Sequence, residues 1–126
     1  GNPLAMAVGN AVLDIVLAPG FLDEVARKGL LLRQRLAELR DRHPDVIAGL
    51  RGEGLMMGVQ TKVPVGEFVA AARDAHILTI PAADNVARLL PPLTVTDDEL
   101  AEGVRRLEQA CVAVEKARAP QQGAAE

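Results

Sequence analysis

Aromatic residues are almost absent from this sequence of 126 residues, which contains no tryptophan, no tyrosine and two phenylalanines. Proteins that bind nucleic acids usually stack bases on aromatic side chains and carry a basic surface. Here the formal net charge is -3 and the isoelectric point is about 5.4. The composition therefore excludes a nucleic-acid-binding function.

Nucleophiles and metal ligands are scarce as well. Serine does not occur, Cys111 is the single cysteine, and His43 and His76 are the two histidines. A lone cysteine forms no internal disulfide, which suits a reducing, cytoplasmic compartment. Because these side chains have neither the spacing of a ligand pair nor that of a catalytic triad, we expect no metal site and no hydrolase chemistry.

The three lysines, Lys28, Lys62 and Lys116, lack the sequence context of a catalytic lysine. A lysine that forms a Schiff base needs a desolvated pocket that lowers its pKa. Lys28 and Lys116 fall on charged helix faces, and Lys62 falls where a strand ends. Residues 51–54 (RGEG) resemble part of a phosphate-binding loop but lack its third glycine and its lysine-hydroxyl ending. We therefore predict no complete active site and no catalytic residue in this chain.

Long hydrophobic runs are also missing. The most apolar stretch, residues 3–18, is interrupted by Gly9, Asn10 and Asp14 and is too short for a membrane span. The first residues lack the basic start of a signal peptide. We expect a soluble protein that does not contact membranes.

The composition that is present, 49% hydrophobic and 25% charged, is that of a globular domain with regular helical and strand patterns. Their order indicates an α+β fold in which a short sheet is covered by helices on one face. The predicted helices are residues 3–18, 21–42, 64–75 and a last helix that begins after Thr96, and the predicted strands are residues 46–50, 55–61, 77–80 and 86–90.

The first two predicted helices differ in character. Residues 3–18 are almost wholly apolar, so this helix should lie against something that the chain does not contain. The helix at residues 21–42 is amphipathic, with Asp23 and Arg27 as a pair four residues apart on its charged face. Its predicted apolar stripe is Leu22, Val25, Leu32, Leu36 and Leu39.

The last helix has the best local signature, a capping box formed by Thr96 and Glu99. After its apolar stripe, residues 120–126 (PQQGAAE) indicate a disordered tail. We thus divide the chain into a joining helix at residues 1–19, a small α+β domain at residues 20–119 and the tail.

Arg88 is the residue best suited to bind a ligand. It lies in a short apolar strand that a double proline ends, and strand alternation places its side chain on one face with Val86 and Leu90. Burying a guanidinium is costly unless a carboxylate or phosphate meets it. Three alternatives remain open: an ion pair with an internal Asp or Glu, a head group that reaches solvent at the sheet edge, and a ligand.

Three segments, in this order, resemble the class III (ornithine-type) aminotransferases. Residues 1–5 (GNPLA) look like the end of the family's T-x-F-G-G-N-P-L-A segment, residues 51–58 (RGEGLMMG) like its R-G-x-G-L-M-x-G segment, and residues 88–93 (RLLPPL) like its R-x-x-P-P-L segment. The similarity extends to Glu115. Residues 77–92 are most similar to acetylornithine aminotransferases, although Ala83 stands where those enzymes usually have glycine.

The resemblance implies the small C-terminal domain of a fold-type I enzyme that uses pyridoxal 5'-phosphate, preceded by the helix that joins it to a large domain. Such an enzyme is expected to be a cytoplasmic homodimer of arginine biosynthesis that transfers an amino group from acetylornithine to 2-oxoglutarate. The family's cofactor lysine and phosphate-binding residues precede Gly1, so the isolated chain is expected to be inactive. Arg88 matches the arginine that holds the substrate α-carboxylate, and Gly1, Asn2 and Pro3 match the segment beside the neighbouring subunit's cofactor phosphate.

Other interpretations stay open. One is a class III transaminase of the succinylornithine, ornithine or 4-aminobutyrate type. Another is a stand-alone α+β module that binds small carboxylates through Arg88. A third is an assembly piece in which residues 3–18 form an adhesive surface.

Overall fold

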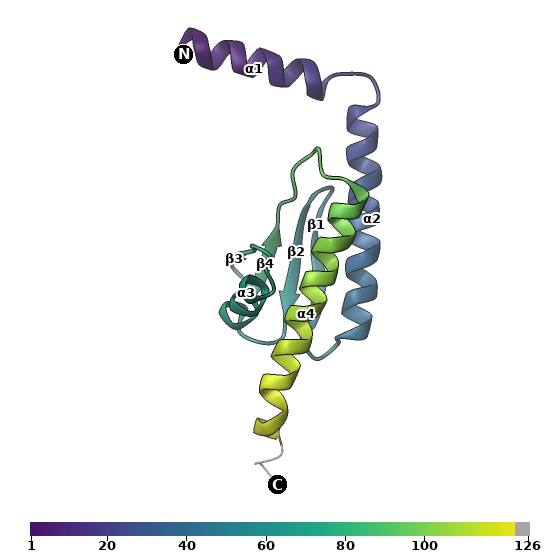
Figure 1. The fold of residues 1–126 in the computed structure, drawn as a ribbon, viewed down its shortest axis with the longest axis vertical. Coiled ribbons are helices and arrows are strands. Elements are labelled where there is room, and N and C mark those ends of the chain that lie inside the picture. Colours follow the sequence, from purple (N-terminus) through teal and green to yellow (C-terminus); the bar gives the residue numbers. More distant parts are fainter. Residues whose placement is uncertain (123–126) are drawn as a thin grey trace.

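A computed structural model of the chain describes residues 1–122 (Figure 1). The α+β prediction is confirmed, and the elements follow one another in the predicted order. They are α1 (Pro3–Val16), α2 (Phe21–Arg42), β1 (Ile47–Glu53), β2 (Met56–Thr61), α3 (Val65–Asp74), β3 (Ile80–Ala82), β4 (Val86–Leu89) and α4 (Asp97–Gln122).

The four strands form one antiparallel sheet in the order β1-β2-β4-β3. Helices α2 and α4 lie side by side against one face of this sheet, and α3 packs beside β3 and β4 (Figure 1). The opposite face, which we call the open face, carries exposed side chains such as Arg51, Met56 and Arg88. This one-sided layer is the arrangement that the order of the predicted elements indicated.

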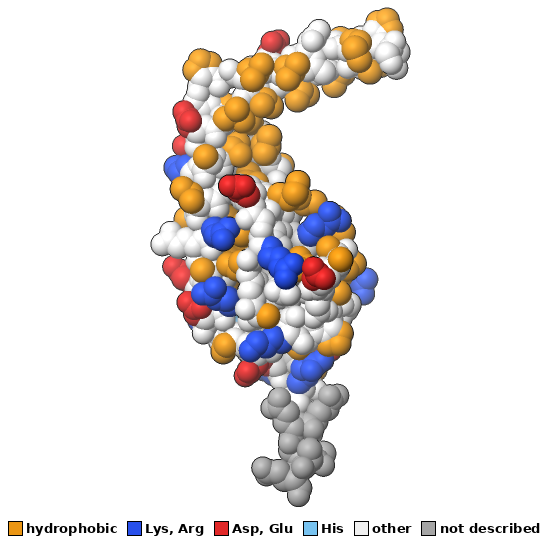
Figure 2. Space-filling view, turned by 180° about the vertical axis from the view of Figure 1, so that it is seen from behind, with side chains coloured by type: hydrophobic (Ala, Val, Ile, Leu, Met, Phe, Trp, Pro, Cys, Tyr) orange, Lys and Arg blue, Asp and Glu red, His pale blue; other side chains and the backbone are white. Residues whose placement is uncertain are grey.

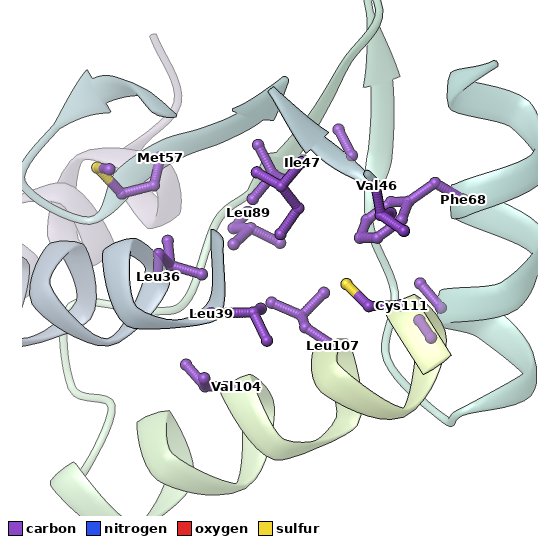
Figure 3. Close-up of a cluster of buried hydrophobic side chains, with 14 of the residues drawn as sticks. Leu36, Leu39, Val46, Ile47, Met57, Phe68, Leu89, Val104, Leu107 and Cys111 are labelled. Carbon is purple, nitrogen blue, oxygen red and sulfur yellow. The ribbon is translucent and has the colours of Figure 1, made fainter. Parts of the chain in front are cut away.

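The core between the sheet and the helices is aliphatic apart from one phenylalanine (Figure 3). Leu36 and Leu39 of α2 point toward Leu107 of α4, and Phe68 of α3 fills the space beside Val46. All five side chains are buried, and full burial of each large one stabilises the fold by roughly 1.5–3 kcal/mol. The predicted stripe of α4 is confirmed, because Leu100, Val104, Leu107, Cys111 and Val114 are all buried.

The predicted capping box at the start of α4 is also present. The backbone N–H of Glu99 donates to Thr96 Oγ1 at 3.1 Å, and the backbone N–H of Thr96 donates to Glu99 Oε2 at 2.8 Å. These two bonds satisfy donors that a helix start otherwise leaves unpaired. At the other end, α4 continues to Gln122 and so includes the first three residues of the tail expected from Pro120. The remainder, residues 123–126, lies outside the described residues.

The third strand is placed differently from the prediction, which put it at residues 77–80. Strand β3 instead covers Ile80–Ala82, so it begins at the last residue of the predicted strand and includes Pro81. The reason is the end of α3, where His76 has a left-handed backbone (φ 62°) and the N–H of Ile77 donates to Ala72 O at 3.0 Å. Ile77 consequently packs against the helical layer, and the sheet is rejoined three residues later. Pro81 is tolerated because β3 is an edge strand.

Two details of α2 also differ from the prediction. Leu22 is not on the buried stripe, since its side chain is 52% exposed. The expected pair of Asp23 and Arg27 is absent; Arg27 instead binds Glu24 at 3.0 Å and Asp97 of α4 at 2.8 Å. Glu24, three residues before Arg27 on the same helix face, and Asp97 from α4 together occupy the guanidinium, so Asp23 does not pair with it.

Helix α1 projects from the body of the molecule as an arm (Figures 1 and 2). None of its residues is buried, and Leu4, Val8, Val12 and Ile15 are each more than half exposed. No single helix within residues 1–122 has the length and apolar composition to cross a membrane. Helices α1 and α2 meet both criteria only when taken together, and they are bent by 71° relative to each other. The arm therefore presents exposed apolar side chains along its length, a feature that often marks contact with another protein segment.

Candidate functional site

Arg88 lies on β4 with its side chain on the open face of the sheet. Its cross-strand neighbours are Gly58 on β2 and Ile80 on β3. The side chain is exposed and forms no hydrogen bond or ion pair with residues 1–122. The internal ion pair considered from the sequence is therefore wrong for this part of the chain. Leu90, expected on the same strand face, follows the end of β4 and is 49% exposed.

A shallow hollow of about 270 Å³ borders Arg88 on the open face. Gly58 lies in its floor. Only glycine fits at this position, because an added Cβ would lie 2.7 Å from Val86 Cγ1. Met56 and Ala82 line the sides, and the surface is mostly apolar apart from its arginines. A planar guanidinium beside an apolar hollow can bind a carboxylate through two parallel hydrogen bonds while the rest of the ligand contacts the apolar wall.

A second arginine, Arg51, faces the same hollow. The register pairs Arg51 with Gly58 and Gly58 with Arg88, so the two arginines lie in one row across the sheet. Arg51 Nη1 lies 3.1 Å from Asp84 Oδ2, with both side chains more than half exposed. Such a surface pair contributes at most about 1 kcal/mol to stability. The sequence placed this arginine in the RGEG stretch and in the family's R-G-x-G-L-M-x-G segment, but only the strand pairing showed which face of the sheet it occupies.

Asn85 is the polar residue that sequence reasoning missed. It lies in the turn between β3 and β4, where Asp84 and Asn85 both have left-handed backbones (φ 58° and 59°). Its side chain binds the backbone of Thr61, Val63 and Val65. The signal available in the sequence was an Asp-Asn pair between two apolar runs, since these residues tolerate left-handed turns and bond to nearby backbone groups.

The structure does not bring Gly1, Asn2 and Pro3 to the Arg88 hollow. They lie at the free end of the arm, where α1 begins at Pro3 (Figure 1), and all three are exposed. Asn2 Oδ1 accepts a hydrogen bond from the backbone N–H of Ala5 at 2.8 Å and so caps the helix. Their expected position near a cofactor phosphate stays a prediction.

The nucleophilic side chains of the chain are in unsuitable surroundings. Lys62 and Lys116 are exposed and Lys28 is half-buried, so none is in the desolvated pocket that a Schiff-base lysine requires. Burial raises the pKa of the Cys111 thiol to about 12, with a further contribution from the nearby Glu115 and Glu108 carboxylates. This thiol stays protonated and unreactive at neutral pH. Among residues 1–122 no cluster of His, Cys, Asp and Glu could hold a metal ion.

The geometry around Arg88 does not identify a protein family, but comparison with known proteins does. Residues 1–111 match the family described as Aminotransferase class-III. The acetylornithine aminotransferase of Agrobacterium fabrum is 57% identical over 114 residues, which are 90% of this chain and 29% of that protein. The corresponding enzyme of Bacillus subtilis is 49% identical over 111 residues, 87% of this chain and 28% of that protein.

The solved structures agree with this. The N-acetylornithine aminotransferase of Stenotrophomonas maltophilia superposes with a TM-score of 0.85 at 34% identity, covering 94% of this chain and 33% of that one. The ornithine aminotransferase of Toxoplasma gondii gives a TM-score of 0.82 at 29% identity, covering 93% and 28%. The chain thus spans less than a third of the length of the first two curated relatives named above and about a third or less of these structures. Because the family pattern extends over most of its sequence, this chain belongs to the class-III aminotransferases.

Proposed function

We propose that the chain is the C-terminal part of an acetylornithine aminotransferase and that Arg88 holds the α-carboxylate of the substrate. The observation that carries this proposal is an exposed guanidinium without a partner in residues 1–122, beside an apolar hollow, at the position of the family's R-x-x-P-P-L arginine. The identity of 57% to an enzyme with that name supports the choice of acetylornithine. An ornithine aminotransferase is the second candidate, favoured by the superposition on the Toxoplasma gondii enzyme.

The cofactor of the intact enzyme would be pyridoxal 5'-phosphate, which would carry the amino group between the two substrates. The side chains of this chain do not supply its lysine anchor, because all three lysines lie at or near the surface. We infer that the anchor belongs to a large domain upstream. Gly1, Asn2 and Pro3 would lie beside the cofactor of the neighbouring subunit in a homodimer. The enzyme would work in the cytoplasm, in arginine biosynthesis.

In this arrangement the chain contributes substrate binding and orientation. The Arg88 guanidinium would hold the carboxylate with two parallel hydrogen bonds, and the hollow would accept the adjoining methylene groups. Anchoring one end of the donor fixes the distance of its amino group from the reacting centre. Apolar surface around the hollow would exclude water from the ion pair and so strengthen it.

The test is amino transfer from acetylornithine to 2-oxoglutarate by the intact protein that contains this chain. Replacing Arg88 with alanine should lower kcat/KM for acetylornithine about 100-fold, since hydrogen bonds to a charged group contribute roughly 1.5–3 kcal/mol. Arg88→Lys should recover only part of this loss, because an ammonium cannot form the planar fork.

The matched control is Arg73→Ala on α3, which removes another exposed arginine without a partner in residues 1–122. It should leave kcat/KM within about twofold of the original enzyme, as most surface substitutions do. Equal activity of the Arg88→Ala and Arg73→Ala variants would refute the role of Arg88. A higher kcat/KM for ornithine than for acetylornithine would select the second candidate.

A further inference from the structure

The turn before β4 is tied to the rest of the fold by the side chain of Asn85. Its Nδ2 group donates to Thr61 O and to Val63 O, both at 2.6 Å. Its Oδ1 accepts from the backbone N–H of Val65 at 2.8 Å. One amide therefore joins the end of β2, the following loop and the first turn of α3.

The backbone of Asn85 strengthens the same connection. Asn85 O accepts from the N–H of Thr61 at 2.9 Å and from Thr61 Oγ1 at 3.2 Å. The pairing of β4 with β2 begins immediately afterwards, with Val86 opposite Gln60, and continues to Leu89 opposite Met57. These hydrogen bonds thus fix the position at which the β2–β4 ladder begins, and that ladder is only four residue pairs long.

Specific hydrogen bonds at one end are needed to fix the register of so short a ladder, because the alternation of apolar residues alone does not determine it. A slip by one residue is opposed, since it would turn Ala87 and Leu89 from the core to the open face. A slip by two residues keeps the alternation, yet it would move Arg88 along the sheet by about 6.5 Å. That slip would separate the Asn85 amide from Thr61, Val63 and Val65 together, so these three bonds discriminate against it.

We propose that Asn85 is the positioning residue for Arg88: its side chain sets the register of β4 and thereby places the Arg88 guanidinium beside the hollow above Gly58. The consequence for catalysis rests on the function proposed above for Arg88. Asn85 does not touch the ligand in this arrangement. Its contribution is to the geometry of carboxylate binding, so its loss should weaken the binding of the carboxylate-bearing donor more than it slows turnover.

The experiment compares two variants of Asn85 in the intact aminotransferase. Asn85→Gly retains the left-handed backbone and removes all three side-chain hydrogen bonds. Asn85→Asp retains the acceptor for Val65 but presents a carboxylate oxygen to two carbonyl groups. The reference is Arg88→Ala, and the control for lost stability is Val114→Ala, a buried position of α4 outside the β2–β4 ladder.

The measured quantity is the ratio of kcat/KM for acetylornithine to kcat/KM for N-acetylputrescine, the same donor without its α-carboxylate. For Asn85→Gly and Asn85→Asp we expect this ratio to fall about tenfold, through a higher KM for acetylornithine with kcat within about twofold. Amide hydrogen exchange of residues 86–89 should become faster in the same variants. Val114→Ala should lower the melting temperature and leave the ratio unchanged.

The outcomes separate the two proposals. If Arg88→Ala collapses the ratio while both Asn85 variants keep it, the role of Asn85 is refuted and that of Arg88 stands. If Arg88→Ala itself leaves the ratio unchanged, the function proposed for Arg88 is wrong and the positioning role of Asn85 in substrate binding is refuted with it. If Val114→Ala lowered the ratio as much as the Asn85 variants do, the fall would report lost stability, and the positioning role of Asn85 would be refuted.

Discussion

Glycine at position 29 decides how closely α2 approaches the turn between β1 and β2. A Cβ built on Gly29 would lie 2.7 Å from Gly54 Cα and 2.8 Å from Gly54 C, and these are backbone atoms that cannot rotate away. Gly29 is buried in the middle of α2, where glycine is otherwise unfavourable. Its presence is explained by packing, because the helix contacts the backbone of the turn that joins β1 to β2.

Replacing Gly29 with alanine should therefore destabilise the fold by about 1–3 kcal/mol, the usual cost of overpacking, despite the better helix propensity of alanine. The measurement is urea unfolding of the intact protein, followed by circular dichroism. The control is Gly66→Ala in α3, where an added Cβ meets nothing within 4 Å and a gain of up to about 1 kcal/mol is expected. Equal midpoints for the two variants would contradict the steric explanation.

At the scale of elements, local signals predicted helices better than strands. The start of α4 was readable because the capping box is formed by residues three positions apart, Thr96 and Glu99. The start of β3 was not readable, because it depends on where the chain leaves the helical layer after His76. Strand identity depends on pairing with distant residues, which a periodic pattern does not specify.

Removing the capping hydroxyl tests how much the α4 signal contributes. Thr96→Ala should lower the free energy of unfolding by about 1 kcal/mol, since it leaves the N–H of Glu99 without its partner. The control is Thr94→Ala, two residues earlier, whose exposed side chain forms no hydrogen bond within residues 1–122. Urea midpoints of the two variants that differ by less than experimental error would show that water replaces the cap at no cost.

At the scale of the whole molecule, the chain looks like one part of a larger assembly. Helix α1 exposes apolar side chains along its length, and Figure 2 shows them continuing onto the neighbouring part of α2 around a concave side. Leu22, Leu30, Leu90 and Leu93 are also more than two-fifths exposed. Surfaces of this kind are usually covered in the working protein. The relative from Agrobacterium fabrum is more than three times longer than this chain, and we expect the rest of such a protein to cover this surface.

Without that domain, the arm should make the isolated chain self-associate. Changing both Val8 and Val12, which are 56% and 51% exposed, to glutamate should lower the average mass measured by light scattering toward that of a monomer. The control adds two charges elsewhere, through Gln34→Glu and Gln109→Glu, at exposed positions on α2 and α4. A control that disperses the chain equally well would mean that net charge, and not the arm, governs association.

Sequence alone determined the features that short-range chemistry encodes. These are the amphipathic faces of α2 and α4, the capping box, the all-round apolar character of α1 and the choice of Arg88 as the candidate ligand-binding residue. The resemblance to class III aminotransferases also came from contiguous motifs, which need no tertiary contact to be recognised. Of the alternatives for Arg88, however, the sequence could not select one.

Only the tertiary structure decided how these parts meet. Strand pairing placed Arg51 and Arg88 in one row across Gly58, and it exposed the Arg88 side chain on the open face. The fold also gave Arg27 a partner 70 residues away and Asn85 three backbone partners more than 19 residues away. The physical reason is that hydrogen bonds and ion pairs form wherever groups meet in space, and the register of a sheet brings together residues whose separation in sequence carries no signal.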